Sequence, residues 1–374
     1  MTFKDKLRGA VYGTAIGDAM GAPVEGWPPE RILEDFGAHG FETFLPPTHV
    51  GDPEKGKGAG RITDDTLMTE ALILAYAQAR SHLDAYGYLR HLLPQVKERR
   101  CWIPEWQQEA CPWERLWHPE KYPWLRLLCA NAEPRTAGVG NMVNCGVAMW
   151  MMPAGAVNAG DPRAAYQEAV LLGSAHNESF AVEAGAVMAA AAAEALSDAG
   201  TLESVLDTAA ALGEDGTGRA VSAAVAAAES GDALTLFIRK TRAAIMPFDP
   251  RSGHGADDQP LERPAFSDVG RPSRIHAIEE LPVALAALRY GQGDALKTLK
   301  AAVCYGRDCD SIAGMAMALF GALYGVDALP AGLCAAADRA NRRNFAALAD
   351  LLHEAARTIL AEDRVHFRRR EQSV

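Results

Sequence analysis

Apolar residues recur every three or four positions along most of the chain, the spacing that places side chains on one face of a helix. In residues 64–80, this spacing is followed by Leu67, Ala71, Leu74 and Ala75, so the segment is predicted to be helical. Further helices are predicted over 162–172, 178–197, 202–212, 218–229, 232–243, 277–290, 293–305, 311–324 and 337–361. No segment shows the strict polar–apolar alternation of a strand, and no repeat of fixed period is found. The pattern therefore predicts an all-α fold.

Four glycines recur at regular spacing near the N-terminus. They are Gly9, Gly13, Gly17 and Gly21, and on a helix over residues 5–22 they would line one face. Each glycine weakens an isolated helix by ~1 kcal/mol relative to alanine. The pattern makes sense if another backbone approaches this face very closely.

The segments between the predicted helices are rich in Pro and Gly. A loop is expected over 23–61, and residues 101–126 contain five Trp and four Pro. We expect a single domain over 1–365, with a Trp-rich insertion near 101–126, a long loop and candidate gate near 246–275, and a frayed tail over 366–374. The insertion is either a lid that stacks on a ligand ring or a local hydrophobic cluster or subunit contact.

Composition narrows the classes of protein. The 374 residues include 49% hydrophobic and 23% charged residues, typical of a globular protein. The formal net charge of −11 disfavours nucleic acid as a partner. No apolar run approaches the ~18 residues of a membrane span, and the N-terminus lacks the apolar core of a signal peptide. The seven Cys contain no CxxC pair and are expected to be reduced thiols in a cytoplasmic protein.

Two short acidic segments stand out as candidate chemistry. The first is TDDT, residues 63–66, and the second is DCDS, residues 308–311. Each lies at the start of a predicted helix, where Asp, Thr and Ser are preferred caps. Capping needs only one carboxylate per helix, and clustered carboxylates repel one another unless a cation or proton intervenes. The alternative is a site for hard cations such as Mg²⁺ or Mn²⁺, which prefer oxygen ligands.

Several motifs resemble those of the ADP-ribosylglycohydrolase family, which includes dinitrogenase-reductase-activating glycohydrolases. They occur in the family's order: GAVYGTAIGDAMGAPVE (9–25), RITDDT (61–66), LPVALAAL (281–288) and GRDCDSIAGMAMALFGALYG (306–325). The resemblance implies a compact, orthogonal multi-helix bundle with two Mg²⁺ or Mn²⁺ ions in a central cleft. It also implies hydrolysis of the bond between the anomeric carbon of ADP-ribose and an acceptor atom.

Carried over position by position, the resemblance implies roles for individual residues. The implied metal ligands are Thr63, Asp64, Asp65, Asp308, Asp310 and Ser311. The implied catalytic residues are Glu25, Asp65 and Asp310, with Glu25 accepting a proton from the attacking water. The implied substrate-binding residues are Asn141, Asn144, Gly146, His176 and Arg307. Asp18 is expected to be a buried structural carboxylate, and His176 could equally be a polar residue at a helix start without a catalytic role.

Three positions depart from the family pattern. Ser311 replaces Thr and keeps the hydroxyl, and Arg307 replaces Gly and adds a potential anion contact. Trp150 replaces the arginine that follows the ribose-pocket loop, GVGNMVNCGVAMW, so a cation and several donors are lost there.

Three functional hypotheses follow from the sequence. The first is a metal-dependent hydrolase that releases ADP-ribose from an ADP-ribosylated protein or small molecule. The second keeps the fold and metals but acts on a smaller ribosylated metabolite or nucleoside. The third is a catalytically inactive, ligand-binding protein on the same scaffold. None of the three requires nucleic acid or a membrane, and the sequence leaves the oligomeric state open.

Overall fold

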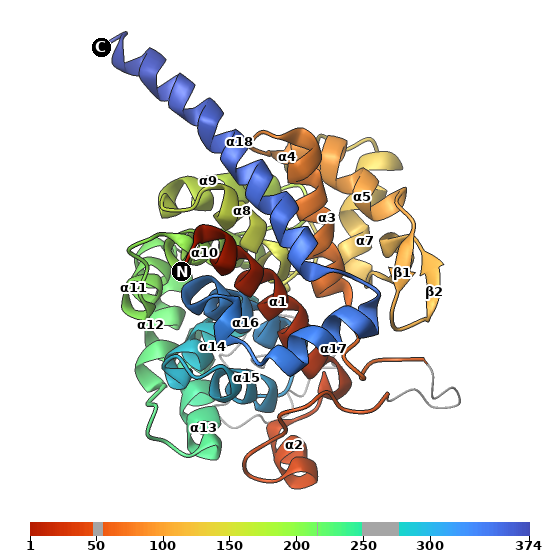
Figure 1. The fold of residues 1–374 in the computed structure, drawn as a ribbon, viewed down its shortest axis with the longest axis vertical. Helices are drawn as coiled ribbons and strands as arrows, with labels where there is room; N and C mark the ends of the chain where they lie inside the picture. The colour runs from red at the N-terminus through yellow and green to blue at the C-terminus, as the bar shows by residue number, and fades with distance from the viewer. Residues whose placement is uncertain (48–54, 215, 249–276) are drawn as a thin grey trace.

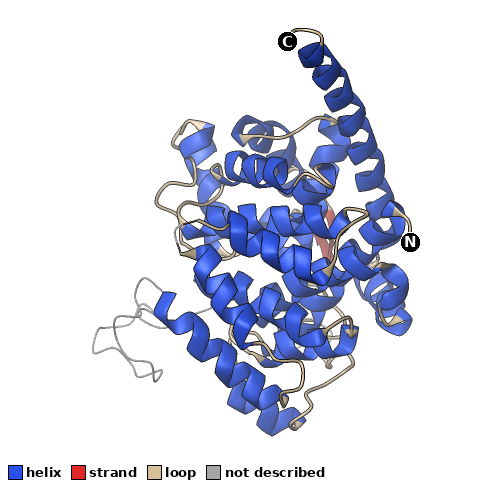
Figure 2. Cartoon of the chain, turned by 90° about the vertical axis from the view of Figure 1, so that its left-hand side faces the viewer, coloured by secondary structure: helices blue, strands red, loops and turns tan. Residues whose placement is uncertain are grey.

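The computed structural model describes residues 1–47, 55–214, 216–248 and 277–374. Over these residues the chain is a packed assembly of helices with one small two-stranded hairpin (Figures 1 and 2). The all-α prediction is therefore confirmed. Within the described ranges, no helix combines the length and apolar character needed to cross a membrane.

The elements follow one another along the chain as labelled in Figure 1. The first part holds α1 (Phe3–Gly21), α2 (Pro29–Phe36), α3 (Asp64–Ala79), α4 (Ala85–Gly87), α5 (Leu93–Lys97), β1 (Cys101–Ile103), β2 (Gln108–Ala110), α6 (Pro112–Arg115) and α7 (His118–Leu128). The middle holds α8 (Met152–Val157), α9 (Pro162–Gly173), α10 (Phe180–Leu196), α11 (Leu202–Leu212), α12 (Thr217–Ala227) and α13 (Leu234–Ile245). The last part holds α14 (Ala277–Gly291), α15 (Ala295–Cys304), α16 (Cys309–Tyr324), α17 (Ala331–Asn341) and α18 (Phe345–Glu371). Single helical turns are η1 (Ala22–Val24), η2 (Tyr88–Leu92), η3 (Pro134–Thr136), η4 (Ala148–Trp150), η5 (Met246–Phe248) and η6 (Val326–Ala328).

The glycine face of α1 packs against α16. A Cβ atom added to Gly13 would lie 2.0 Å from the carbonyl oxygen of Met317, and one added to Gly17 would lie 2.1 Å from that of Ala313. Only glycine allows two helix backbones to come this close. The expected close approach is thus found, and its partner is the helix that begins with the second acidic segment.

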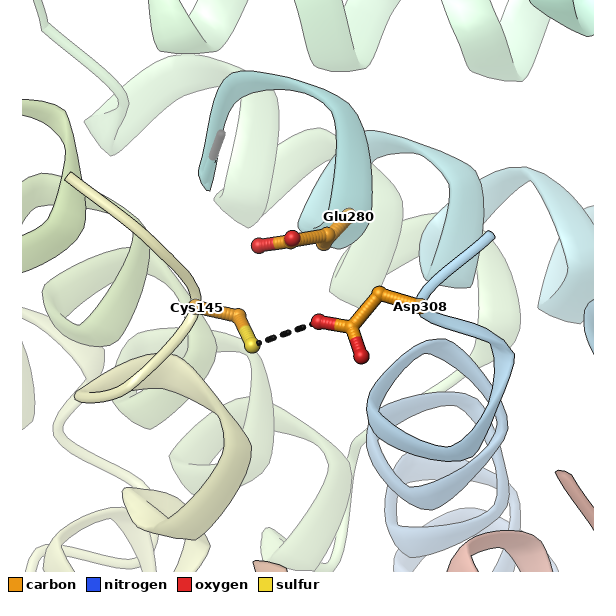
Figure 3. Close-up of side chains that lie close together, drawn as sticks. All are labelled: Cys145, Glu280 and Asp308. Carbon is orange, nitrogen blue, oxygen red and sulfur yellow. Dashed lines mark hydrogen bonds between the residues drawn. The ribbon is translucent and has the colours of Figure 1, made fainter. Parts of the chain in front are cut away.

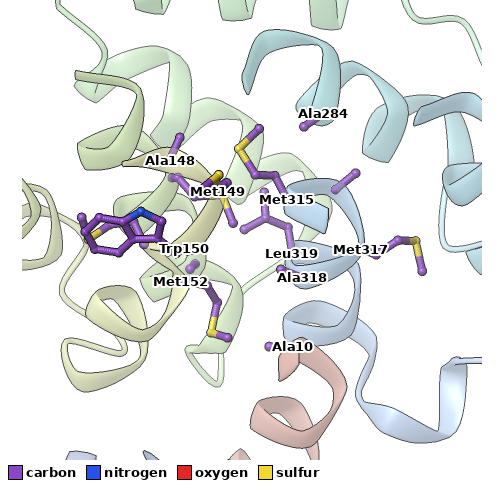
Figure 4. Close-up of a cluster of buried hydrophobic side chains, with 14 of the residues drawn as sticks. Ala10, Ala148, Met149, Trp150, Met152, Ala284, Met315, Met317, Ala318 and Leu319 are labelled. Atoms are coloured by element: carbon purple, nitrogen blue, oxygen red, sulfur yellow. The ribbon is translucent and has the colours of Figure 1, made fainter. Parts of the chain in front are cut away.

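The hydrophobic core lies where α1, α10, α14 and α16 meet. Every residue of α16 from Cys309 to Leu323 is buried, as expected for a helix that is apolar on all sides. Figure 4 shows Met315 and Leu319 of α16 beside Met149 of η4, with Ala10 of α1 and Ala284 of α14 in the same cluster.

The structure differs from the predictions at three places. The predicted helix over 337–361 is two helices, because Arg342 adopts a left-handed conformation (φ 51°) and the Asn344 side chain caps the start of α18. The tail predicted to be frayed is helical as far as Glu371, and the end of α18 projects from the body in Figure 1. The predicted loop over 23–61 contains α2.

The Trp-rich segment, residues 101–126, contains the only strands among the described residues. Strands β1 and β2 pair antiparallel in the register Cys101↔Ala110, a hairpin that the sequence pattern did not predict. Each strand has three residues, too few to show alternation in the sequence. The rings of Trp113 and Trp124 lie 4.8 Å apart, which supports the hydrophobic-cluster interpretation. Of the predicted loop 246–275, residues 249–275 lie outside the described residues.

Candidate active site

The two acidic segments converge on one cavity. Its volume is about 310 Å³, and the starts of α3 and α16 lie at its wall together with Glu25, which directly follows η1. The described residues that line it are Glu25, Lys57, Asp64, Asp65, Arg115, Leu116, Trp117, His118, Glu120, Asn144, Cys145, Met149, Asp308, Asp310 and Ser311. The sequence could not show that the two segments meet, and the packing of α1 against α16 and α3 brings them together.

The capping alternative does not account for the acidic segments. Thr63 and Asp308 occupy the N-cap positions of α3 and α16, but neither side chain accepts a hydrogen bond from its helix. Asp18 of α1 performs that task for α3, since its carboxylate accepts from the backbone N–H groups of Thr63 (2.9 Å) and Thr66 (3.2 Å). As expected, Asp18 is fully buried. Its carboxylate ties α1 to the start of α3.

Carboxylate oxygens gather closely enough to share cations. In one group, oxygens of Asp18, Asp65 and Asp310 lie within 4.8 Å of one another, and in a second group those of Glu25, Asp308 and Asp310 do so. The Asp65 Oδ1 atom is buried and has no hydrogen-bond partner. A buried, unpaired oxygen of this kind is costly unless a cation or proton satisfies it. The oxygen-rich set therefore fits a hard divalent cation.

The electrostatics of the cluster agree with this fit. Burial, followed by the neighbouring carboxylate of Glu25, raises the pKa of Asp310 to about 7. Burial and the surrounding carboxylates also raise the pKa values of Asp65 and Asp308 well above their usual range. These carboxylates resist sharing one site as anions, so a bound cation is favoured there.

Two cationic side chains, those of Lys57 and Arg115, lie at the cavity wall, and both contact carboxylates. The Lys57 ammonium pairs with Glu25 and lies 3.6 Å from Asp310 Oδ2. Burial lowers the pKa of Lys57, but the charges of Asp310 and Glu25 outweigh that effect and raise it. Arg115 of the insertion lies 2.7 Å from Asp64 Oδ1 and also pairs with Glu105.

A third group of possible ligands combines sulfur with oxygen. Cys145, Glu280 and Asp308 each place one ligand atom within 4.8 Å of the others, and the Cys145 thiol donates to Asp308 Oδ2 at 3.1 Å (Figure 3). Burial raises the pKa of Cys145 well above its usual range. Neither Cys145 nor Glu280 was predicted from the sequence as a site residue. The signal that could have identified Glu280 is the acidic pair Glu279–Glu280 in the first turn of a mainly apolar helix.

The predicted ligands and catalytic residues fall together, with one exception. Glu25, Asp64, Asp65, Asp308, Asp310 and Ser311 all line the cavity. Thr63 is fully buried beside it, and its hydroxyl donates to Asp65 Oδ2 at 3.1 Å. The cavity also contains Lys57, Arg115 and Glu120. These residues were not predicted, because nothing in their local sequence distinguishes them from ordinary loop or helix residues.

The predicted substrate-binding residues divide into two layers. Asn144 lines the cavity. Asn141, Gly146 and His176 lie behind it, where the Asn141 amide donates to the carbonyl oxygens of Pro119 and His176. Arg307 does not reach the cavity lining, because its side chain pairs with Glu279 (3.2 Å). Direct contact of these residues with substrate stays a prediction.

Trp150 lies outside the cavity as well. The side chain is fully buried, and its ring packs edge-on against His176 with the centroids 5.3 Å apart. The departure from the family arginine therefore changes the residues behind the cavity wall.

Comparisons with known proteins find similarity over almost the whole chain. The sequence profile described as ADP-ribosylglycohydrolase matches residues 1–361. The uncharacterized protein YegU of Escherichia coli (strain K12) is 25% identical over 342 residues, which cover 91% of this chain and 94% of that protein. A solved structure, described as an ADP-ribosylglycohydrolase-related protein complex, has a TM-score of 0.60 at 21% identity and covers 95% of this chain and 99% of its own.

Proposed function

Since the chain belongs to the ADP-ribosylglycohydrolase family of hydrolases, we propose that it cleaves the bond between C1 of a ribosyl group and its leaving group. Two Mg²⁺ or Mn²⁺ ions are the proposed cofactors, held by Thr63, Asp64, Asp65, Asp308, Asp310 and Ser311. The observation that carries the proposal is the buried carboxylate cluster with the unpaired Asp65 Oδ1 atom. Bound there, the cations would orient the ribosyl group and stabilise developing negative charge.

The chain's own residues supply the remaining chemistry. Glu25 lines the cavity beside Asp308 and Asp310, and Lys57 fixes the direction of its carboxylate. We assign to Glu25 the proton of the water that attacks C1, the usual task of a carboxylate in ribosyl and glycosyl hydrolysis. Asp65 and Asp310 act through the cations that they bind.

The first candidate substrate is an ADP-ribosylated protein or small molecule, because the family acts on ADP-ribosylated substrates. A specific observation favours a second candidate, a smaller and less charged ribosyl compound. With every carboxyl group ionised, as in a metal-bound site, the described lining carries six carboxylates and two cationic side chains, a formal net charge of −4. Two divalent cations would neutralise this charge and leave no excess positive charge for a diphosphate.

The test measures metal content and turnover in the same preparations. We expect about two Mn²⁺ per chain by elemental analysis of the wild type. Asp310→Asn should bind Mn²⁺ much more weakly with unchanged helix content, whereas the exposed control Asp327→Asn should match the wild type. Normal binding of both ions by Asp310→Asn would show that the ligand assignment is wrong.

Turnover is then followed by chromatography with Mg²⁺ or Mn²⁺ present. The panel contains ADP-ribosyl-arginine, an ADP-ribosyl-serine peptide, an ADP-ribose phosphoester and simple nucleosides. Cleavage of nucleosides alone would select the second candidate over the first. Protein that binds both ions but cleaves no member of the panel would support the third hypothesis, an inactive ligand-binding protein.

A further inference from the structure

Glu120 is a buried carboxylate at the cavity that the mechanism above does not use. It lies in the first turn of α7, within the Trp-rich insertion, and its exposed fraction is 3%. It lines the same cavity as the proposed metal ligands but belongs to none of the carboxylate groups close enough to share a cation. A buried carboxylate is costly unless its oxygens are hydrogen-bonded. The hydrogen-bond partners of Glu120 therefore indicate its role.

Two side chains behind the cavity hold Glu120. Its Oε2 atom contacts His176 Nε2, and its Oε1 atom accepts from Asn144 Nδ2 at 3.0 Å. His176 is fully buried, and its other ring nitrogen, Nδ1, lies 2.9 Å from the Tyr88 hydroxyl. An ionised carboxylate can only accept hydrogen bonds, so the contact with Glu120 requires the proton on His176 Nε2. In the neutral ring Nδ1 then accepts from the Tyr88 hydroxyl, which keeps its proton because burial and the charge of Glu120 raise its pKa.

The backbone also leaves room for this carboxylate. A Cβ atom on Gly146 would lie only 2.7 Å from Glu120 Oε1, so a larger residue there would displace it. The Trp150 ring packs edge-on against His176. Residues from α7, the Gly146 loop and the turn between α9 and α10 thus combine to fix the direction of one carboxylate.

A carboxylate held in this way still has acceptor capacity. Its two oxygens offer about four lone-pair positions, of which His176 and Asn144 use two. Both cationic side chains of the described cavity lining, Lys57 and Arg115, contact other carboxylates. The charge of Glu120 at the cavity wall therefore attracts a hydrogen-bond donor and repels an anion.

We propose that Glu120 is a specificity-determining residue, which accepts a hydrogen bond from an uncharged O–H or N–H group of the ribosyl substrate and disfavours an anionic group there. The inference rests on the proposed ribosyl hydrolase function and deepens it. His176 and Tyr88 act as positioning residues for this carboxylate.

The experiment compares two probes on full-length, Mn²⁺-loaded protein by calorimetry. Adenosine is the uncharged ribosyl probe, and ADP-ribose is the anionic one. Glu120→Gln keeps the size of the side chain and removes the charge. It should weaken adenosine binding by about 10- to 100-fold, the scale of a hydrogen bond to a charged group, and should leave ADP-ribose binding unchanged or stronger. Glu109→Gln, an exposed position of the same insertion, is the matched control and should change neither.

A second variant covers a failure of Glu120→Gln to fold. Glu120→Asp keeps the charge but moves the carboxylate away from the cavity, and should weaken adenosine binding by about threefold to tenfold without strengthening ADP-ribose binding. Equal weakening of both probes, no change for adenosine, or no adenosine binding by the metal-loaded wild type would each overturn the proposal. Failure of the wild type to bind Mn²⁺ would instead refute the proposed function, so the two failures are distinguishable.

Discussion

The contact between α1 and α16 predicts that Gly13→Ala lowers the stability of the fold, whereas helix propensity alone predicts that it raises it. Gly13 lies in the middle of α1, where alanine would normally improve helix stability by ~1 kcal/mol. If only helix propensity mattered, Gly13→Ala would stabilise the protein. The structure predicts the opposite, because the new Cβ would lie 2.0 Å from the Met317 carbonyl oxygen and 2.6 Å from its carbon.

The size of the effect follows from the distance that must open. Cβ atoms essentially never come closer than 3.0 Å to another heavy atom, so α1 and α16 must separate locally by about 1 Å. Overpacking of a filled core typically costs about 1–3 kcal/mol. Because the atom in the way belongs to a backbone, we expect a value near the upper end, about 2–3 kcal/mol after the gain in helix propensity.

The assay is urea unfolding at constant pH, followed by circular dichroism. Gly332→Ala is the matched control, because it is a helical glycine in α17 whose added Cβ meets nothing within 4 Å. It should be neutral or stabilise by up to ~1 kcal/mol. The reasoning is refuted if Gly13→Ala is as stable as the wild type, or more stable, with an unchanged denaturant slope.

Three further predictions concern the site and its supports. Glu25→Gln should lower kcat by ~10²-fold or more with little change in melting temperature, and near-normal turnover would remove Glu25 from the mechanism. Gly146→Ala should displace Glu120 and destabilise by about 1–3 kcal/mol, with Mn²⁺ binding retained, as measured by calorimetry. Hydrogen bonding to Glu168 raises the pKa of His82 from 6.5 to about 9. The stability that protonated His82 adds to the fold is therefore complete below pH 6.5 and is lost as the pH rises through 9. His82→Gln should therefore destabilise the protein by up to ~1 kcal/mol at pH 6, a value discounted for solvent screening. Above pH 10 the loss of stability should be much smaller. An equal loss of stability at both pH values, measured by urea unfolding, would contradict this prediction.

The proposed site also explains why the family match does not fix the substrate. The two acidic segments resemble the family's motifs, whereas Glu120 and Arg115 come from the Trp-rich segment and Trp150 departs from the pattern. The part of the cavity that recognises the rest of the substrate is thus built from the less typical portions of the chain. Substrate choice has to be measured on this protein, with neutral and anionic probes side by side.

The sequence by itself determined the fold class, most of the helices and the residues of the two acidic segments. These features are local, because the spacing of apolar residues records which face of a helix is buried, and a glycine at every fourth position records a close approach. The short β1–β2 hairpin and the break between α17 and α18 escaped because they depend on a few residues whose conformation is set by their neighbours. The tail that was expected to be frayed is also helical as far as Glu371, although these last residues are exposed and project from the body.

Only the tertiary structure decided which distant residues share the cavity. Asp18 caps α3 from another helix, Arg307 turns to Glu279 instead of the cavity, and Trp150 packs behind the wall against His176. Glu120, His176 and Asn144 meet across more than fifty positions of sequence. No local pattern encodes such meetings, since they arise when close-packed helices place side chains from separate segments at one point.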